Sequence, residues 1–158
     1  MAHDHPVLGF DAHDHAACVA AALAAADATC RDHRLKFTPI RRRVLEILLE
    51  SHAALGAYDV LDRLAQEGRG AQPPVAYRAL SFLVEHGFAH RIERLNAYVA
   101  CARPGASHDP AFLICTDCGA VAEAEGAFER TADTGGFRIA ATVMEAEGLC
   151  PACQTHAT

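Results

Sequence analysis

The sequence of 158 residues lacks any apolar stretch approaching the ~20 residues that a helix needs to cross a bilayer. Its beginning, MAHDHPVLGF, has neither the basic n-region nor the apolar h-region of a secretory signal. Outside the cysteines, no nucleophile paired with a base and no loop built to cradle phosphate suggests catalysis. We therefore expect a cytoplasmic protein that has no membrane partner, acts on no small-molecule substrate and is not an enzyme.

Basic residues are absent from residues 1–30, which carry four Asp. Residues 31–94 carry 11 Lys and Arg against 8 Asp and Glu, whereas residues 95–158 carry 3 against 8. The net charge of −6 argues mildly against a nucleic-acid partner. A local basic patch matters more to a polyanion than the total charge, however, and the middle block is the one with a basic excess.

Half of the residues are hydrophobic, so a core is available. Residues 16–34 form an Ala-rich run without Gly or Pro and predict a first helix. Thr38 suits the N-cap of a second helix, and Pro39 suits its first position. Residues 56–68 predict a third helix, and residues 74–86 predict a fourth.

The fourth helix is predicted to have two different faces. Its buried stripe is expected to consist of Ala76, Ala79, Leu80, Leu83 and Val84. Tyr77, Arg78 and Ser81 then lie on the opposite face. The hydrophobic period changes to two afterwards, so residues 88–101 predict a hairpin that turns near residues 95–96. Three or four helices followed by a hairpin is the order of elements in a winged helix-turn-helix.

A Pro- and Gly-containing stretch, residues 102–111, is expected to be a hinge linker. It follows a flexible His-containing tail, residues 1–15, and a winged-helix domain, residues 16–101. In residues 112–158 the runs AFLIC, GAVAEAE and GFRIAATVMEAEG predict strands, and GAFERTADTG predicts a helix. The predicted fold class is α+β, a winged helix-turn-helix followed by a small α/β domain.

Four of the seven cysteines form two CxxC pairs, Cys115/Cys118 and Cys150/Cys153. Thiols stay reduced in a cytoplasm, which favours metal or catalytic roles over disulfides. Four thiolates at two turns match a closed, tetrahedral structural zinc site, and a domain this small usually needs such a clip. The alternative is a thioredoxin-like redox motif, which requires one CxxC at a helix N-terminus and fits two matched pairs less well.

A second set of metal ligands follows from the predicted hairpin. If its turn is centred between residues 95 and 96, His90 lies directly opposite Cys101, within chelating distance. His108 in the linker and Glu123 in the second domain complete a tetrahedron, in which the thiolate favours zinc over iron(II) or manganese(II). The alternatives are a surface histidine and a cysteine that acts as a small core hydrophobe.

The segments that combine these features are LKFTPIRRRVLEILL, AYDVLDRL, PPVAYRALSFLVEHGFAHRIE, NAYVAC, SHDPAFLICTDCGAV and GLCPAC. Together they resemble the ferric uptake regulator family of metal-responsive repressors, most closely its zinc uptake regulator branch. The resemblance implies a homodimer with a DNA-binding winged helix and a C-terminal dimerisation domain. It also implies two zinc ions per chain. Its structural site corresponds to Cys115, Cys118, Cys150 and Cys153, and its regulatory site to His90, Cys101, His108 and Glu123.

On the same resemblance, the fourth predicted helix reads operator DNA. Arg78 is the candidate for a bidentate contact to guanine, flanked by Tyr77 and Ser81. Tyr58, at the start of the third helix, matches a DNA-contact position of the family. The consecutive arginines at residues 41–43 (Arg41, Arg42 and Arg43) are expected to contact phosphates.

The resulting hypothesis is a repressor of zinc-uptake genes that binds DNA when zinc joins the winged helix to the second domain. Two alternatives stay open. An iron- or peroxide-responsive member of the same family is one, although SHDPAF stands where the iron branch carries a His-rich run before the first CxxC. A CxxC-based thiol oxidoreductase is the other.

Overall fold

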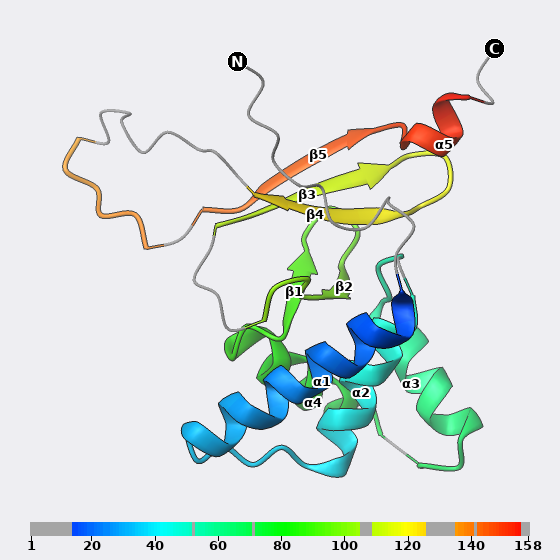
Figure 1. Ribbon diagram of the computed structural model, residues 1–158, viewed down its shortest axis with the longest axis vertical. Coiled ribbons are helices and arrows are strands. Elements are labelled where there is room, and N and C mark those ends of the chain that lie inside the picture. Colours follow the sequence, from blue (N-terminus) through cyan, green and yellow to red (C-terminus); the bar gives the residue numbers. More distant parts are fainter. Residues whose placement is uncertain are drawn as a thin grey trace. The chain divides into compact units, whose positions relative to one another are not determined.

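The computed structural model describes residues 14–51, 53–70, 72–104, 109–125, 135–140 and 142–155. The chain divides into two compact units, and the boundary between them falls after Ala106. Figure 1 shows helices and a hairpin in the first unit, and a sheet with one short helix in the second. Separate helices and small sheets make the fold α+β, as predicted. Among the described helices, none is long and apolar enough to cross a membrane.

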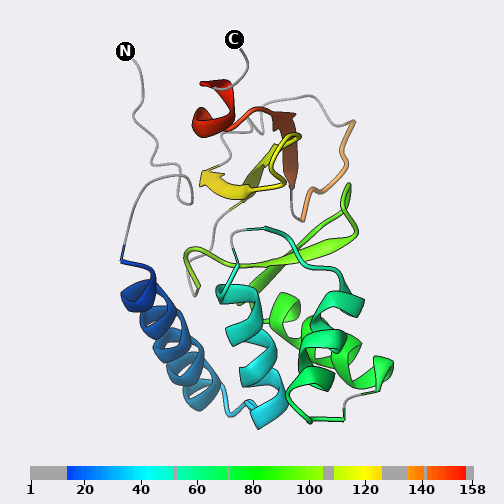
Figure 2. The same cartoon turned by 90° about the vertical axis from the view of Figure 1, so that its right-hand side faces the viewer.

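The described residues of the first unit form four helices. They are α1 (His15–Asp32), α2 (Pro39–Leu49), α3 (Ala57–Gln66) and α4 (Pro73–Glu85), close to the four predicted ranges. In Figure 2, α2 lies between α1 on one side and α3 and α4 on the other. Helix α2 packs against each of these helices and is therefore the central helix of the unit. The expected tail lies outside the described residues up to residue 13, and its last residue, His15, begins α1.

Local sequence signals explain where the helices begin. The Thr38 hydroxyl accepts a hydrogen bond from the backbone N–H of Arg41 (3.4 Å), and Pro39 occupies the first position of α2, as predicted. At the start of α3, the backbone N–H of Gly56 donates to the Asp59 carboxylate (2.8 Å). Each bond satisfies a polar group that helix geometry leaves without an intrahelical partner.

The helices and the hairpin bury one hydrophobic core. Its largest members include Leu45, Ile47, Leu48, Val60, Leu64, Leu80, Leu83 and Phe88. The stripe predicted for α4 is buried except at Val84, which is 37% exposed. That prediction was wrong because Phe82, on the other flank of the stripe, takes the buried place and is only 7% exposed. The Phe82 ring packs against Phe88 at the entrance to the hairpin, with ring centroids 6.4 Å apart.

The hairpin consists of β1 (Ala89–Ile92) and β2 (Ala97–Ala100), joined by a four-residue turn. His90 is paired with Val99, so the predicted pairing of His90 with Cys101 was wrong. The turn is centred one residue earlier than predicted, because Asn96 adopts the left-handed conformation (φ 46°) as its last residue. When the centre of the turn moves by one residue, the partner of each residue on the opposite strand changes by two, so His90 faces Val99 in place of Cys101.

The second unit is built on a three-stranded sheet in the order β4-β3-β5. Strand β3 (Pro110–Cys115) pairs antiparallel with β4 (Val121–Glu125) and parallel with β5 (Met144–Gly148). The short helix α5 (Pro151–Gln154) follows β5 directly. The third predicted strand is shorter than expected, because none of the described strands pairs with residues 137–140. The helix predicted at residues 126–135 lies outside the described residues, except for its last position.

Candidate metal centres and nucleic-acid interface

Both CxxC pairs lie at the same end of the sheet in the second unit. Cys115 closes β3, and Cys118 lies in the turn that leads into β4. Cys150 is the N-cap of α5, and Cys153 lies within that helix. The parallel pairing of β3 with β5 places Cys115 beside Gly148, two residues before Cys150. The sheet therefore joins two motifs that are far apart in the sequence.

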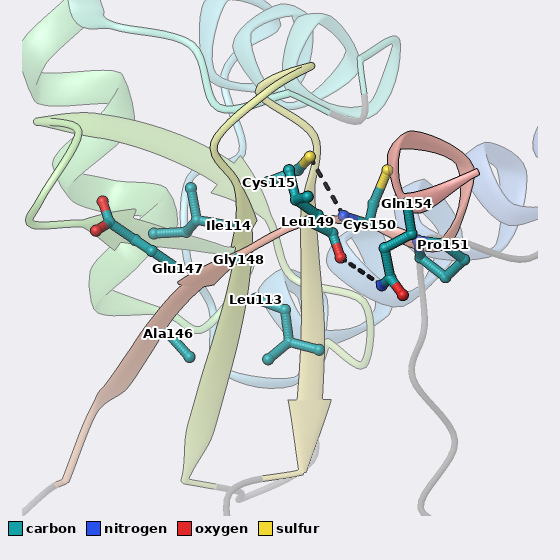
Figure 3. A pocket seen from close by; sticks show the side chains of 10 residues that line it. All are labelled: Leu113, Ile114, Cys115, Ala146, Glu147, Gly148, Leu149, Cys150, Pro151 and Gln154. Carbon is teal, nitrogen blue, oxygen red and sulfur yellow. Dashed lines mark hydrogen bonds between the residues drawn. The ribbon is translucent and has the colours of Figure 1, made fainter. Parts of the chain in front are cut away.

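The four cysteine sulfurs are grouped within 4.8 Å of one another. The Sγ atoms of Cys118 and Cys150 are 3.8 Å apart. Two sulfurs that are each ~2.3 Å from one tetrahedral zinc ion lie about 3.8 Å apart, so this spacing fits zinc. The backbone N–H of Cys150 also donates to Cys115 Sγ (3.3 Å), as the dashed line in Figure 3 shows. N–H···S bonds of this kind orient and stabilise ligating thiolates.

Hydrogen bonds shift the pKa values of two thiols in this cluster in opposite directions. The backbone N–H groups of Cys118 and Cys150 donate to Cys115 and lower the pKa of that thiol to about 6. In contrast, the pKa of the Cys153 thiol is raised, chiefly because it donates a hydrogen bond to Asp117. A divalent cation would replace the shared protons, because metal ligation requires thiolates. Four converging sulfurs fit a metal clip better than the single CxxC of a thiol oxidoreductase.

A pocket of about 360 Å³ lies beside the cysteines, between β3, β5 and α5. Its lining residues, drawn in Figure 3, are Leu113, Ile114, Cys115, Ala146, Glu147, Gly148, Leu149, Cys150, Pro151 and Gln154. The side-chain amide of Gln154 donates to the backbone carbonyl of Leu149 (2.8 Å). Besides the two cysteines, the ionisable side chain in the lining is Glu147. Polar groups therefore do not converge here as they do in a small-molecule site.

In the first unit, the hairpin brings His90 and Cys101 together. The backbone N–H of Cys101 donates to the carbonyl of Phe88 (2.9 Å), so Cys101 lies opposite Phe88, two residues beyond Val99. His90 and Cys101 are therefore diagonal neighbours on one face, and their ligand atoms lie within 4.8 Å. The expected chelating pair exists although the register was predicted wrongly, because a shift of two residues keeps each side chain on its face.

Of the other two predicted ligands, Glu123 belongs to the second unit. Glu123 lies on β4, where it is paired with Phe112, and its side chain is buried. A buried carboxylate is costly unless a cation or hydrogen bonds compensate it, which suits a metal ligand. His108 lies outside the described residues.

The predicted reading face of α4 is exposed. Tyr77 is 44% exposed, and Arg78 and Ser81 are exposed beside it. Tyr58, at the start of α3, is 65% exposed. The adjacent Tyr77 and Arg78 on α4, and the exposed Tyr58 on α3, carry polar groups suited to base edges, sugars and phosphates.

The three arginines of α2, which were predicted to contact phosphates, each have a partner within the first unit. The Arg41 guanidinium lies over the Phe82 ring, Arg42 pairs with Asp27, and Arg43 pairs with several glutamates. The sequence offered two signals for these contacts, the i,i+3 spacing of Arg43 and Glu46 and the i,i+4 spacing of Arg42 and Glu46. The contacts of Arg41 with Phe82 and of Arg42 with Asp27 depend on tertiary packing.

Comparisons with known proteins agree with this arrangement. The Ferric uptake regulator family matches residues 32–145. Zinc uptake regulation proteins of Escherichia coli (strain K12) and Shigella flexneri are each 42% identical over 139 residues, 83% of this chain and 80% of theirs. A zinc uptake regulator complexed with zinc and DNA superposes with a TM-score of 0.78 and 36% identity, over 89% of this chain and 98% of that one. The crystal structure of holo XcZur superposes with a TM-score of 0.76 and 36% identity, over 84% of this chain and 96% of that one. This chain therefore belongs to the ferric uptake regulator family, in its zinc uptake regulator branch.

Proposed function

We propose that this protein is a zinc-responsive, sequence-specific DNA-binding repressor of zinc-uptake genes, with zinc as the co-repressor. The observation that carries the proposal is the His90–Cys101 pair on the hairpin, which is separate from the four-cysteine cluster. A pair of this kind has no role in holding the second unit together and is therefore available for sensing. Relatives named for zinc uptake regulation, one of them in a complex with zinc and DNA, support the choice of metal and partner.

Two zinc ions per chain are assigned to two different tasks. The structural ion belongs to the four cysteines, where it supplies a cross-link between β3 and the segment after β5. The regulatory ion belongs to His90, Cys101, His108 and Glu123. One thiolate among these four ligands favours zinc over iron(II) or manganese(II), which makes an iron- or peroxide-responsive regulator the weaker alternative.

The regulatory ligands come from both sides of the linker. His90 and Cys101 belong to the first unit, Glu123 belongs to the second, and His108 lies between them in the sequence. Residues that share one ion restrict the linker and so restrict the spacing of the two reading helices in a homodimer. Zinc thereby shifts the population toward the dimer that fits successive major grooves. Reciprocity then requires operator DNA to raise the zinc affinity of the same site.

The proposed DNA interface is formed by Arg78, Tyr77 and Ser81 on α4 and Tyr58 on α3. Arg78 would contact a guanine edge, and the tyrosines and Ser81 would contact neighbouring bases, sugars or phosphates. We place the protein in the cytoplasm as a regulator without enzymatic activity. The thiol oxidoreductase alternative is disfavoured because both CxxC pairs are used by one cluster.

The test is operator binding at buffered free zinc by Cys101→Ser and His90→Ala, with iron(II) and manganese(II) as control metals. We expect both variants to keep the structural zinc and to lose zinc-dependent DNA binding. If both still bind the operator tightly at low zinc, and as tightly as wild type at high zinc, the proposed sensing site is wrong. Catalytic disulfide turnover by the zinc-free protein would instead favour the oxidoreductase.

A further inference from the structure

Three consecutive arginines on α2 each reach a different part of the first unit. An α-helix turns by about 100° per residue, so consecutive side chains leave it in different directions. Because α2 packs against α1, α3 and α4, these directions lead to three different neighbours. Arg41 reaches α4, Arg42 reaches α1, and Arg43 reaches the end of α3.

Arg41 contacts the C-terminal part of α4. Its guanidinium carbon lies 3.9 Å from the centre of the Phe82 ring, which is a close cation–π contact. The same guanidinium donates to the backbone carbonyl of Lys36 in the connection between α1 and α2. His86 packs on the Phe82 ring as well, with ring centroids 4.6 Å apart. Phe82 is one residue from Ser81 on α4, so this contact sets the position of the reading face.

Arg43 holds the end of α3. Its Nε and Nη2 atoms donate to the carboxylate of Glu67, the C-cap of α3, in a bidentate pair. Its Nη1 atom donates to Glu46 (3.0 Å) and Glu50 (2.9 Å). Glu67 also pairs with Arg69 (3.4 Å) in the connection that leads from α3 to α4. Arg43 therefore holds the point at which the chain leaves α3 for the connection to α4.

Arg42 completes the set toward α1. Its Nη1 atom donates to the carboxylate of Asp27 (2.7 Å), and its Nε atom lies 3.5 Å from Glu46. The charges of Arg42 and Arg43 are thus already offset by carboxylates within the unit. A cation in this state gains little from a DNA phosphate, because the gain comes from replacing mobile counterions with free positive charge.

We infer that the arginine run Arg41–Arg43 is a brace that positions α3 and α4 for DNA reading, and that it does not contact phosphates. The inference rests on the proposed function, because α4 is the reading helix only if the protein binds DNA. In this role Arg41 and Arg43 are positioning residues: they act through Phe82 and Glu67. The guanidinium is required, since a Lys ammonium has neither a flat face for the ring nor a fork for the carboxylate.

Two substitutions separate a brace from a set of phosphate contacts. Arg41→Lys keeps the positive charge but loses the stacking on Phe82. Glu67→Gln removes a negative charge, which should strengthen DNA binding if electrostatics alone mattered. We expect each variant to bind operator DNA roughly three- to tenfold more weakly, with no loss of affinity for non-specific DNA. Binding is measured with excess zinc over a range of salt concentrations, at a temperature where circular dichroism shows every variant folded.

The salt dependence provides the decisive control. Each phosphate contact that is lost lowers the slope of log K against log salt concentration by about 0.9. We expect the slopes measured for Arg41→Gln and Arg43→Gln to equal that of wild type. We also expect the double variant, Arg43→Gln with Glu67→Gln, to bind the operator no more weakly than Arg43→Gln alone. A reduced slope would overturn the brace in favour of phosphate contacts. Lowered melting temperatures with unchanged preference for the operator would overturn it in favour of a role in stability only.

Wild-type protein distinguishes this inference from the proposed function. If wild type shows no zinc-dependent preference for the operator, the proposed function fails and the brace fails with it. If wild type shows that preference while Arg41→Lys and Glu67→Gln behave like wild type, the brace alone is wrong.

Discussion

Cys101 lies diagonally across the hairpin from His90, with Val99 directly opposite His90. The two side chains share one face of the hairpin, and their ligand atoms lie within 4.8 Å. A diagonal arrangement keeps the pair in chelating range while directly opposed positions remain available for packing. The sensing chemistry proposed for this protein therefore begins within one hairpin, at the end of the strands that lies away from the four-residue turn.

Loss of one structural cysteine should release zinc and destabilise the second unit. We expect Cys150→Ser to lower the zinc content by one ion per chain and to lower the melting temperature of the unit by well over ten degrees, because structural zinc supplies much of the folding free energy of small domains. Metal analysis and thermal denaturation measure both effects. Cys18→Ser, which changes an exposed cysteine on α1, is the matched control and should leave both unchanged.

In the metal-free cluster, the thiols of Cys115 and Cys153 should ionise at very different pH values. The pKa of Cys115 is lowered to about 6 from an ordinary value of 9.0, whereas that of Cys153 is raised. The ionised Cys115 therefore stabilises the metal-free folded state above pH 9, and this contribution disappears as the pH falls through 6. The raised pKa of Cys153 acts in the opposite sense: its stabilisation is present below pH 9 and is lost as the pH rises through the folded pKa.

Thiolate absorbance of the zinc-free protein measures this directly. One thiolate should form near pH 6 in wild type and be missing in Cys115→Ser. Formation of all thiolates together near pH 9 would contradict the hydrogen bonding described for Cys115.

The two flanks of the α4 stripe should respond very differently to truncation. Phe82→Ala removes a buried ring and should cost about 3–5 kcal/mol of stability. Val84→Ala, at a position 37% exposed, should change stability by roughly 0.5 kcal/mol or less. Denaturant unfolding of the full chain, followed by far-ultraviolet circular dichroism, measures both. Equal costs would mean that the helix is rotated relative to the arrangement described here.

Arg78 should carry sequence information, unlike the arginines of α2. We expect Arg78→Ala to weaken operator binding by about 1–3 kcal/mol and to relax the preference at one base pair. Ser81→Ala, on the same exposed face, should have a smaller effect and serves as the comparison. Binding to a set of operators with single base changes gives the measurement, and uniform weakening across the set would assign Arg78 to a phosphate instead.

Local sequence signals determined much of this protein. The Thr38–Pro39 pair specified the start of α2, and the apolar period specified the helices and the hairpin, because these depend on short-range sterics and hydrogen bonds. The two CxxC pairs specified a candidate zinc clip, since the ligands within each pair are close in the chain. The segments that resemble the ferric uptake regulator family then predicted the function.

Only the tertiary structure decided how distant parts meet. The parallel pairing of β3 with β5 brings Cys115 to Cys150, and no local pattern encodes which strands pair. The left-handed conformation of Asn96 set the register of the hairpin, which period-two alternation leaves open to shifts of two residues. The partners of Arg41, Arg42 and Arg43 depend on how helices pack around α2, so a run that looks free and basic in the sequence is occupied in the fold.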